Sequence, residues 1–180
     1  MSSAHKKVIV RRFTGETLPG YLTLSGFVRN RAIDLLDLSG RIVPLQLNDI
    51  KHISYVRDFN LHDTANPERL TRRTFLAKPR SEGLWVRMTF RSGDLLEGLA
   101  PIDITLTDDL INDTGLQLTP PDTRSNTQRI YIPRTSLTEL QLLAVITTPS
   151  RRKPLPASSV PSLQEDLFDN LSPPPNTRPN

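Results

Sequence analysis

The pattern Gly-acid-x-Leu-x-Gly occurs twice in this chain and constrains its fold more than any other feature. It is found at residues 15–20 as GETLPG and at residues 93–98 as GDLLEG. An alternating run precedes each copy, at 8–10 and 86–88. A second apolar stretch follows each copy, and isoleucine or leucine recurs within it at short intervals. Such a repeated order of strand and turn signals predicts a duplicated structural unit, and it concerns architecture rather than catalysis.

The first 60 residues predict a small all-β unit. Gly15 is expected in a turn, where glycine adopts positive φ at little cost. Gly20 lies inside an apolar run, which indicates a bulge, a bend or a close backbone approach. Short strands separated by turns roughly every 8–12 residues favour a small barrel over a helical domain. The expected strands are residues 7–13, 17–23, 32–38, 41–47 and 50–55; the last is either a strand throughout or a helical turn that leads into one.

The second half of the chain repeats this pattern between residues 84 and 148. Gly93 and Gly98 are expected to take the turn and bend positions of Gly15 and Gly20. Residues 103–114 diverge most from the first copy, and they read as an acidic loop. The expected strands are residues 84–90, 94–100, 115–119, 129–132 and 138–146. We therefore predict an all-β protein of two tandem small SH3/Sm-like barrels, at residues 1–60 and 84–148, that arose by internal duplication.

Residues 61–83 form a basic connector between the two predicted barrels. Its breakers include Asn66-Pro67, Lys78-Pro79 and Ser81-Glu82-Gly83, although residues 67–77 have the composition of a short helix. Its basic side chains are candidates for phosphate contacts, which would make nucleic-acid binding sensitive to salt. The first half lacks the interleaved aromatic residues that stack on bases, so a solvated linker is the competing interpretation. The candidate nucleic-acid-binding residues are Arg69, Arg72, Arg73, Lys78 and Arg80.

The charge of the chain is divided unevenly along its length. Residues 1–80 carry 14 Lys and Arg against 7 Asp and Glu, a net of +7, whereas residues 81–148 carry 5 against 9, a net of −4. This asymmetry is consistent with docking between the halves, with head-to-tail association, or with an anionic partner on one side.

Residues 149–180 predict a disordered, proline-rich tail. Eight of the 16 prolines lie there, and the tail opens with Arg151-Arg152-Lys153. One island at 162–171 has the stripe of a short amphipathic helix, and a helix of that length needs a surface to lie on. We expect it to dock in cis or in the groove of another protein. The candidate protein-binding residues are Leu163, Gln164, Leu167, Phe168 and Leu171.

Several classes of chemistry find no support in the sequence. There is no cysteine, which excludes disulfides, thiol catalysis and cysteine-bound metals. The chain starts without an apolar signal segment and has no run of about 20 apolar residues, so a cytoplasmic protein is expected. No nucleophile elbow or comparable catalytic frame is present. We expect neither a metal nor a cofactor, because the histidines and the acidic loop lack ligand spacing; these residues are His5, His52, His62, Asp108, Asp109 and Asp113.

Each half resembles an Sm-like or Hfq-like small barrel, in which an apolar strand, a glycine turn and a Leu-x-Gly bend precede a closing strand. The chain is also similar to an uncharacterised bacterial family of duplicated domains. That likeness rests on the segment Val56-Arg57-Asp58-Phe59 and on the loop of residues 120–126, Pro-x-Asp-x-x-Ser-Asn in pattern. This resemblance implies the fold and no activity.

Two shorter likenesses suggest ligands. Asp37-Leu38-Ser39-Gly40, preceded by Arg11 and Arg12, resembles the cyclic-dinucleotide element of PilZ domains, with spacing two residues short; a simple β-turn needs the same residues. Residues 164–168, QEDLF, resemble the peptide by which bacterial proteins bind the sliding clamp, although the second position is usually apolar.

Together these observations predict a non-enzymatic binding or adaptor module. Its expected partner is another protein, and a second copy of the chain is a further candidate. The alternatives are RNA or other nucleic acid bound through the basic first half, and a cyclic dinucleotide bound in the PilZ manner.

Overall fold

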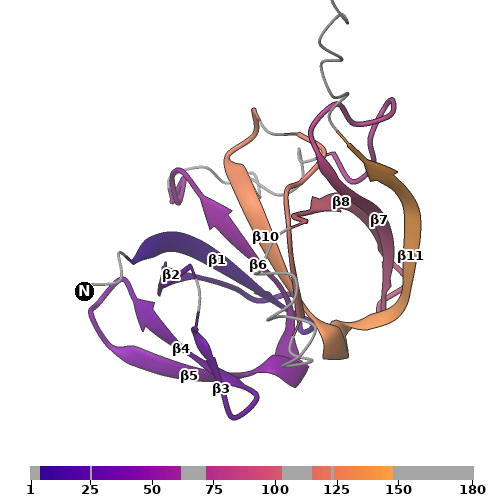
Figure 1. Ribbon diagram of the computed structural model, residues 1–180. Helices are drawn as coiled ribbons and strands as arrows, with labels where there is room; N and C mark the ends of the chain where they lie inside the picture. The colour runs from indigo at the N-terminus through magenta and orange to yellow at the C-terminus, as the bar shows by residue number, and fades with distance from the viewer. Residues whose placement is uncertain (1–4, 25, 62–71, 103–114, 123, 148–180) are drawn as a thin grey trace, which may run out of the picture. The chain divides into compact units, whose positions relative to one another are not determined.

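The computed structural model describes residues 5–24, 26–61, 72–102, 115–122 and 124–147 (Figure 1). Within these ranges the regular structure consists of β-strands and short 3-10 turns, so the protein is all-β as the sequence predicts. The tail, the acidic loop at 103–114 and residues 62–71 lie outside the described residues. None of the helices in the described part is both long and apolar enough to cross a membrane.

The first half contains every strand that the sequence predicts, with ends shifted by at most one residue. It also contains the two-residue strand β3, which the sequence analysis missed because two residues carry no periodicity. A 3-10 turn leads into the last strand of this half, and residues 50–55 are strand throughout, which agrees with the first of the two alternatives predicted for them. The elements are β1 (Lys6–Arg12), β2 (Thr17–Leu22), β3 (Val28–Arg29), β4 (Ala32–Asp37), β5 (Ile42–Gln46), η1 (Leu47–Asp49) and β6 (Ile50–Val56).

The second half has the same order of long strands and again a 3-10 turn before its last strand. Here β10 is longer than predicted, and β11 is the longest strand, with ten residues. The elements are β7 (Gly83–Phe90), β8 (Leu95–Ala100), β9 (Gly115–Leu118), β10 (Thr127–Pro133), η3 (Arg134–Ser136) and β11 (Leu137–Ile146).

The strands form an eight-stranded sheet and a three-stranded sheet, and the larger sheet contains strands from both halves. Its order is β3-β4-β2-β1-β6-β10-β9, with β5 paired to β4; the smaller sheet is β11-β7-β8. The antiparallel pair β6–β10 therefore joins the halves through backbone hydrogen bonds. A β-bridge between Leu99 and Thr119 links the two sheets. The repeated sequence pattern does not predict this shared sheet.

Strand pairing follows one scheme in both halves. β1 lies between β2 and β6, and β7 lies between β8 and β11 (Figure 1). Each half also has a hairpin of its middle strands, β4–β5 in the first and β9–β10 in the second.

Two large hydrophobic cores lie on the inner faces of these strands, and β10 contributes to both; a third, small cluster consists of Ile9, Val56 and Phe59. In the first core, Val8, Val10, Ile53 and other apolar residues pack with Tyr131 from β10. In the second core, Val86, Met88 and Phe90 pack with Ile130 and Ile132, the neighbours of Tyr131. Successive side chains of a strand point to opposite faces, so one strand can supply adjacent residues to two cores.

The glycines of the repeated hexapeptide have two different physical roles. Gly15 and Gly93 have φ of +93° and +81° in the β1–β2 and β7–β8 turns. Gly20 allows close approach instead, because a Cβ there would lie 2.6 Å from the Leu36 carbonyl oxygen. The β1–β2 register continues through Gly20 without a shift, so no bulge is present there. At Gly98 a Cβ would lie 3.1 Å from the Cβ of Leu118.

The predicted helix at residues 67–77 is wrong over residues 72–77, which contain bends and no helical turn. Here the backbone bonds to β8 instead: the amide of Glu97 donates to the carbonyl of Arg73 at 2.7 Å. Tertiary hydrogen bonds thus override the local helical propensity. Residues 67–71 of that prediction lie outside the described part.

The close approach at Gly20 predicts a larger loss of stability on substitution than at Gly98. Gly20→Ala should lower the free energy of unfolding by about 2 kcal/mol, because the new methyl meets backbone that cannot move easily. Gly98→Ala is the matched control. Its new methyl would meet the Leu118 side chain at 3.1 Å and the Thr119 carbonyl oxygen at 3.3 Å, which are longer distances, so it should cost about half as much. Urea denaturation of both variants measures the difference, and equal losses would contradict the explanation.

Candidate binding surface

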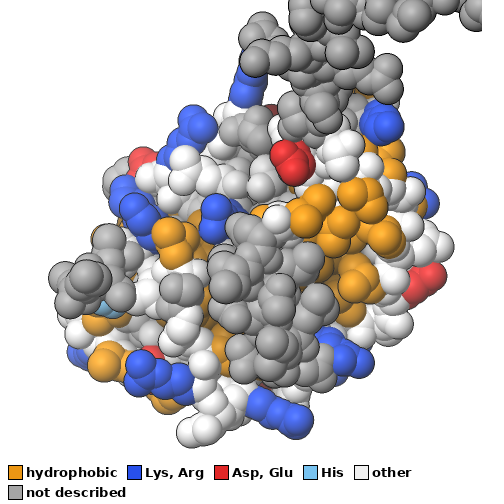
Figure 2. Space-filling view, viewed as in Figure 1, with side chains coloured by type: hydrophobic (Ala, Val, Ile, Leu, Met, Phe, Trp, Pro, Cys, Tyr) orange, Lys and Arg blue, Asp and Glu red, His pale blue; other side chains and the backbone are white. Residues whose placement is uncertain are grey.

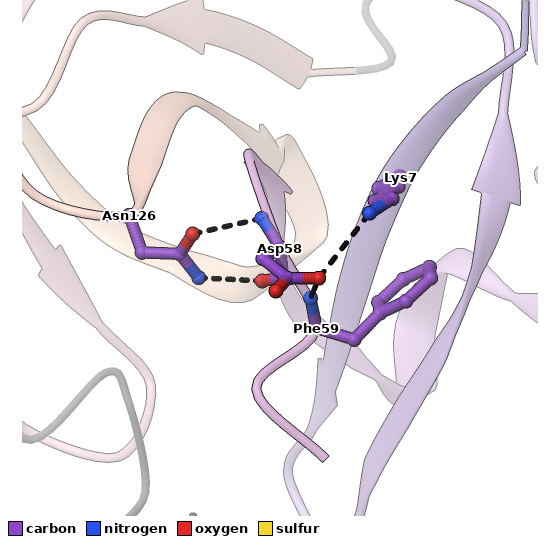
Figure 3. Close-up of polar contacts among 4 residues, drawn as sticks. All are labelled: Lys7, Asp58, Phe59 and Asn126. Carbon is purple, nitrogen blue, oxygen red and sulfur yellow. Dashed lines mark hydrogen bonds and ion pairs between the residues drawn. The ribbon is translucent and has the colours of Figure 1, made fainter. Parts of the chain in front are cut away.

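The two segments that carry the family resemblance meet at the junction between the halves (Figure 3). Asn126 lies at the end of its loop. Its Oδ1 accepts a hydrogen bond from the Asp58 amide at 2.9 Å, and its Nδ2 donates one to the Asp58 carbonyl at 2.7 Å. The amide of Arg57 also donates to the carbonyl of Asn126 at 3.0 Å. These bonds extend the β6–β10 pairing beyond the end of both strands.

The side chains around Asp58 complete this junction. Its carboxylate accepts from the amide of Phe59 at 2.9 Å and from Lys7 Nζ at 3.2 Å (Figure 3). The ammonium of Lys7 lies 5.4 Å from the centre of the Phe59 ring, which packs edge-on against Tyr21. All of these contacts are internal to the fold, so we interpret both motifs as structural.

Glu97, inside the second hexapeptide, is a buried carboxylate that holds the connector. Its side chain accepts from Arg87 Nε at 3.0 Å, from Trp85 Nε1 at 3.2 Å and from the amide of Phe75 at 3.1 Å. Burial raises the pKa of this carboxyl, but the bonds from Phe75, Arg87 and Trp85 together lower the pKa by more, so the net direction is downward. The equivalent position of the first hexapeptide is Pro19, so the carboxylate is specific to the second half.

Asp94 forms an ion pair that connects the halves. Its carboxylate contacts the ammonium of Lys51 on β6, the hydroxyl of Ser92 at 2.8 Å and the guanidinium of Arg73 at 3.0 Å. The bond from Lys51, followed by that from Ser92, holds the pKa of Asp94 well below its usual range. The carboxylate is therefore ionised at any physiological pH.

The predicted basic cluster is brought together only in part. Arg72 and Arg73 line a small pocket beside Lys51 and Asp94, and Lys78 and Arg80 are exposed farther along the connector. Arg69 lies outside the described residues. The Asp94 carboxylate already occupies the cationic centre of this pocket, which lowers its attraction for a phosphate.

The PilZ-like element at residues 37–40 forms a hydrogen-bonded turn. Asp37 Oδ1 accepts from the amides of Ser39 and Arg41, each at 2.8 Å, and from the hydroxyl of Ser39. The bond from the Arg41 amide, followed by that from the Ser39 hydroxyl, lowers the pKa of Asp37. The turn accounts for these residues without a ligand.

The structure does not gather the remaining candidates into a metal site. His52 packs beside Phe90, with ring centres 6.1 Å apart, and His5 is exposed at the start of the described chain. Within the described ranges no three His, Asp or Glu side chains are grouped for a metal. His62 and the acids at 108, 109 and 113 lie outside those ranges, as do the tail candidates at residues 163–171.

The most distinctive exposed feature is an apolar row on β11. Leu140 pairs with Met88, Leu142 with Val86, and Val145 with Leu84. Residues directly opposite each other on paired strands point to the same face, so these three side chains point to the face of the second core. Met88 and Val86 are buried, but Leu140, Leu142 and Val145 are 53%, 58% and 53% exposed. We call these three residues and the free edge of β11 the β11 surface.

The free edge of β11 accompanies this apolar row. Over the described residues β11 pairs only with β7, so its other edge offers unpaired amides and carbonyls. On its opposite face lie Glu139 and Gln141, across from Thr89 and Arg87. Glu139 is the one charged residue between positions 137 and 147.

Sequence reasoning located this strand but missed the surface. The alternation of Glu139, Leu140, Gln141 and Leu142 predicts a strand with one apolar face. The same alternation describes a buried face, and only the pairing shows that no further strand lies beside it in the described part of the chain. The sequence signal that could have indicated an exposed surface was the length of this apolar strand, together with its single charged residue.

The fold is all-β, and strands of two similar halves share one sheet. The chain belongs to the family of unknown function DUF6982, whose model matches residues 4–144. That span includes every described strand except the last two residues of β11. No curated protein and no solved structure matches the chain.

Glu97 predicts a specific acid sensitivity. Because its folded-state pKa is lowered, its stabilising contribution is present above the ordinary glutamate value of about 4.3 and is lost as pH falls through the folded-state pKa. Glu97→Gln should lower the free energy of unfolding by about 2 kcal/mol at pH 7, because charge-assisted bonds to a buried acceptor are weakened. The difference in the free energy of unfolding between the variant and the wild type should become smaller below pH 4.3.

Urea denaturation at several pH values measures this gap. Glu82→Gln, which changes an exposed glutamate at the end of the connector, is the control and should differ little from wild type. A gap that stays constant down to pH 3 would show that Glu97 does not act through its charge.

Proposed function

We propose that this protein is a non-enzymatic protein-binding module, and that it binds its partner as an extended strand along the β11 surface. The observation that carries the proposal is the exposure of Leu140 and Leu142 on a face that is otherwise a core. Exposed apolar rows of this kind, next to a free sheet edge, mark interaction sites. Adding a strand satisfies the free backbone groups and covers the apolar side chains together.

The first half supports this interpretation, because the equivalent place there is covered. We treat the halves as copies of one small SH3/Sm-like barrel, so that Ile50 after η1 corresponds to Leu137 after η3. Ile53 and Tyr55 then correspond to Leu140 and Leu142. Ile53 and Tyr55 are only 0% and 3% exposed.

The covering element in the first half is a strand from the other half. β10 pairs along β6 and places Tyr131 directly opposite Ile53, on the face of the first core. Tyr131 in turn stacks edge-on against Phe27, with ring centres 4.9 Å apart. An added strand beside β11 would supply the same cover to the second half.

The chemistry of the β11 surface favours an apolar peptide over a nucleic acid. Its side chains are two leucines and a valine, and Glu139 on the other face adds negative charge rather than positive. Nucleic-acid sites depend on cationic side chains for most of their affinity. Figure 2 shows hydrophobic side chains gathered over the region where β7, β8 and β11 lie in Figure 1.

A random peptide library displayed on phage tests this function. The wild-type protein should enrich peptides with alternating apolar residues, because a strand presents every second side chain to one face. The variant Leu140→Lys/Leu142→Lys should retain at most about a tenth of that binding, since it places charges where apolar area is buried. Ile42→Lys is the matched control, because Ile42 is 69% exposed on β5, and it should bind normally.

Peptides that bind wild type and the double lysine variant equally would contradict the proposal. The thermal unfolding of both variants should stay cooperative, which separates lost binding from lost folding.

A further inference from the structure

We infer that the partner on the β11 surface is a second copy of this chain, whose own β11 pairs antiparallel with the first. This inference rests on the proposed function and names its occupant. The resulting dimer would have a continuous sheet of six strands, in the order β8-β7-β11 followed by the same strands of the second copy in reverse.

The edges of the sheets identify β11 as the strand that is free to pair. At the far edge of the smaller sheet, β8 is already engaged by the carbonyl of Arg73 and by the bridge between Leu99 and Thr119. In the larger sheet, β3 has only two residues. The edge strand β9 has only four, and Thr119, directly after it, is bridged to Leu99 of β8. Among the described strands, β5 and β11 are left as edges long enough to receive a partner.

Proline blunts the β5 edge. Pro44 lies in the middle of β5 and is paired with Asp34 in an unbroken ladder to β4. Proline has no N–H, so within a ladder it is tolerated where its nitrogen faces the free side of the strand. The outer edge of β5 therefore lacks its central donor, a device that commonly prevents edge-to-edge pairing. β11 has no proline and ten residues.

The lack of a proline on β11 and its low charge suit pairing with itself. Directly opposed like charges destabilise a strand pair, and Glu139 is the only charge available to oppose. With the two-fold axis near Gln141, Leu140 of one copy lies opposite Leu142 of the other, and both remain on the core face. The two Glu139 side chains then lie on the opposite face and away from each other.

The β6–β10 junction within the chain shows what such pairing achieves. Ile53 and Tyr131 lie opposite each other there and are 0% and 1% exposed. A second β11 would cover Leu140 and Leu142 in the same way. A two-fold pair is closed, because each copy uses the same edge, that of β11, whereas pairing of β11 with β5 would leave one edge open at each end.

Sedimentation equilibrium of the full chain tests the dimer. Wild type should show twice the mass of one chain at tens of micromolar, a range typical of modest interfaces. Leu140→Lys/Leu142→Lys should raise the dissociation constant by at least about 100-fold, and Ile42→Lys should leave it unchanged. A dimer that survives the double lysine variant would overturn the inference.

The absence of cysteine from the chain allows the geometry to be tested directly. Gln141→Cys should form a covalent dimer with itself on mild oxidation, because opposed residues of paired strands lie within disulfide range. Ile42→Cys on β5 should not. The two single variants can also be mixed and oxidised. If Gln141→Cys of one chain then links to Ile42→Cys of another in preference to a second Gln141→Cys, the strands pair head to tail, and the inference is overturned.

The two proposals fail in distinguishable ways. A protein that stays monomeric at all concentrations, yet binds library peptides through Leu140 and Leu142, has a β11 surface whose partner is a different protein. That result overturns self-pairing and leaves the proposed function intact. A monomer that binds no peptide overturns both.

Discussion

The antiparallel pairing of β6 with β10 is the interaction on which the rest of this structure depends. It joins strands that are far apart in sequence, and it makes one sheet out of elements from both halves. Because side chains alternate along a strand, the pairing also divides β10 between two cores, with Tyr131 in the first and Ile130 and Ile132 in the second. A slip of one residue would reverse all three, so the register is strongly specified.

The polar contacts near the end of this pair are best understood as devices that fix the register. Asn126 binds both the amide and the carbonyl of Asp58, and a shifted alignment would break both bonds. At the other end, Lys51 on β6 reaches Asp94 in the β7–β8 turn. The motifs that a sequence comparison would select as functional are thus explained by the assembly of the two halves.

The local structure was predictable from the sequence because it depends on short-range signals. The alternating runs and the turns at Gly15 and Gly93 place nearly every long strand, since a strand needs only a period of two and a flexible turn residue. The shared sheet was not predictable, because the choice of β10 as the neighbour of β6 depends on the fit of Tyr131 into a distant core. The helix predicted in the connector is wrong for a similar reason. Glu97 forms hydrogen bonds with the backbone at Arg73 and Phe75, and the helical composition of that segment does not reveal those bonds.

The candidate surface follows from a difference between halves that are otherwise alike. Ile53 and Leu140 have the same kind of side chain, the same place after a 3-10 turn and the same inward direction, yet one is fully buried and the other is 53% exposed. Composition cannot account for this difference, because both strands are apolar. Its cause is topological: β6 has β10 beside it, and β11 is the last strand of the repeated scheme. Among the described strands, β11 therefore keeps one edge without a neighbour, and Pro44 lies in the middle of β5, the other long edge strand. On β6 the apolar side chains and the backbone groups of the edge are covered by β10. On β11 the same groups stay exposed, and a strand from outside the chain can cover them.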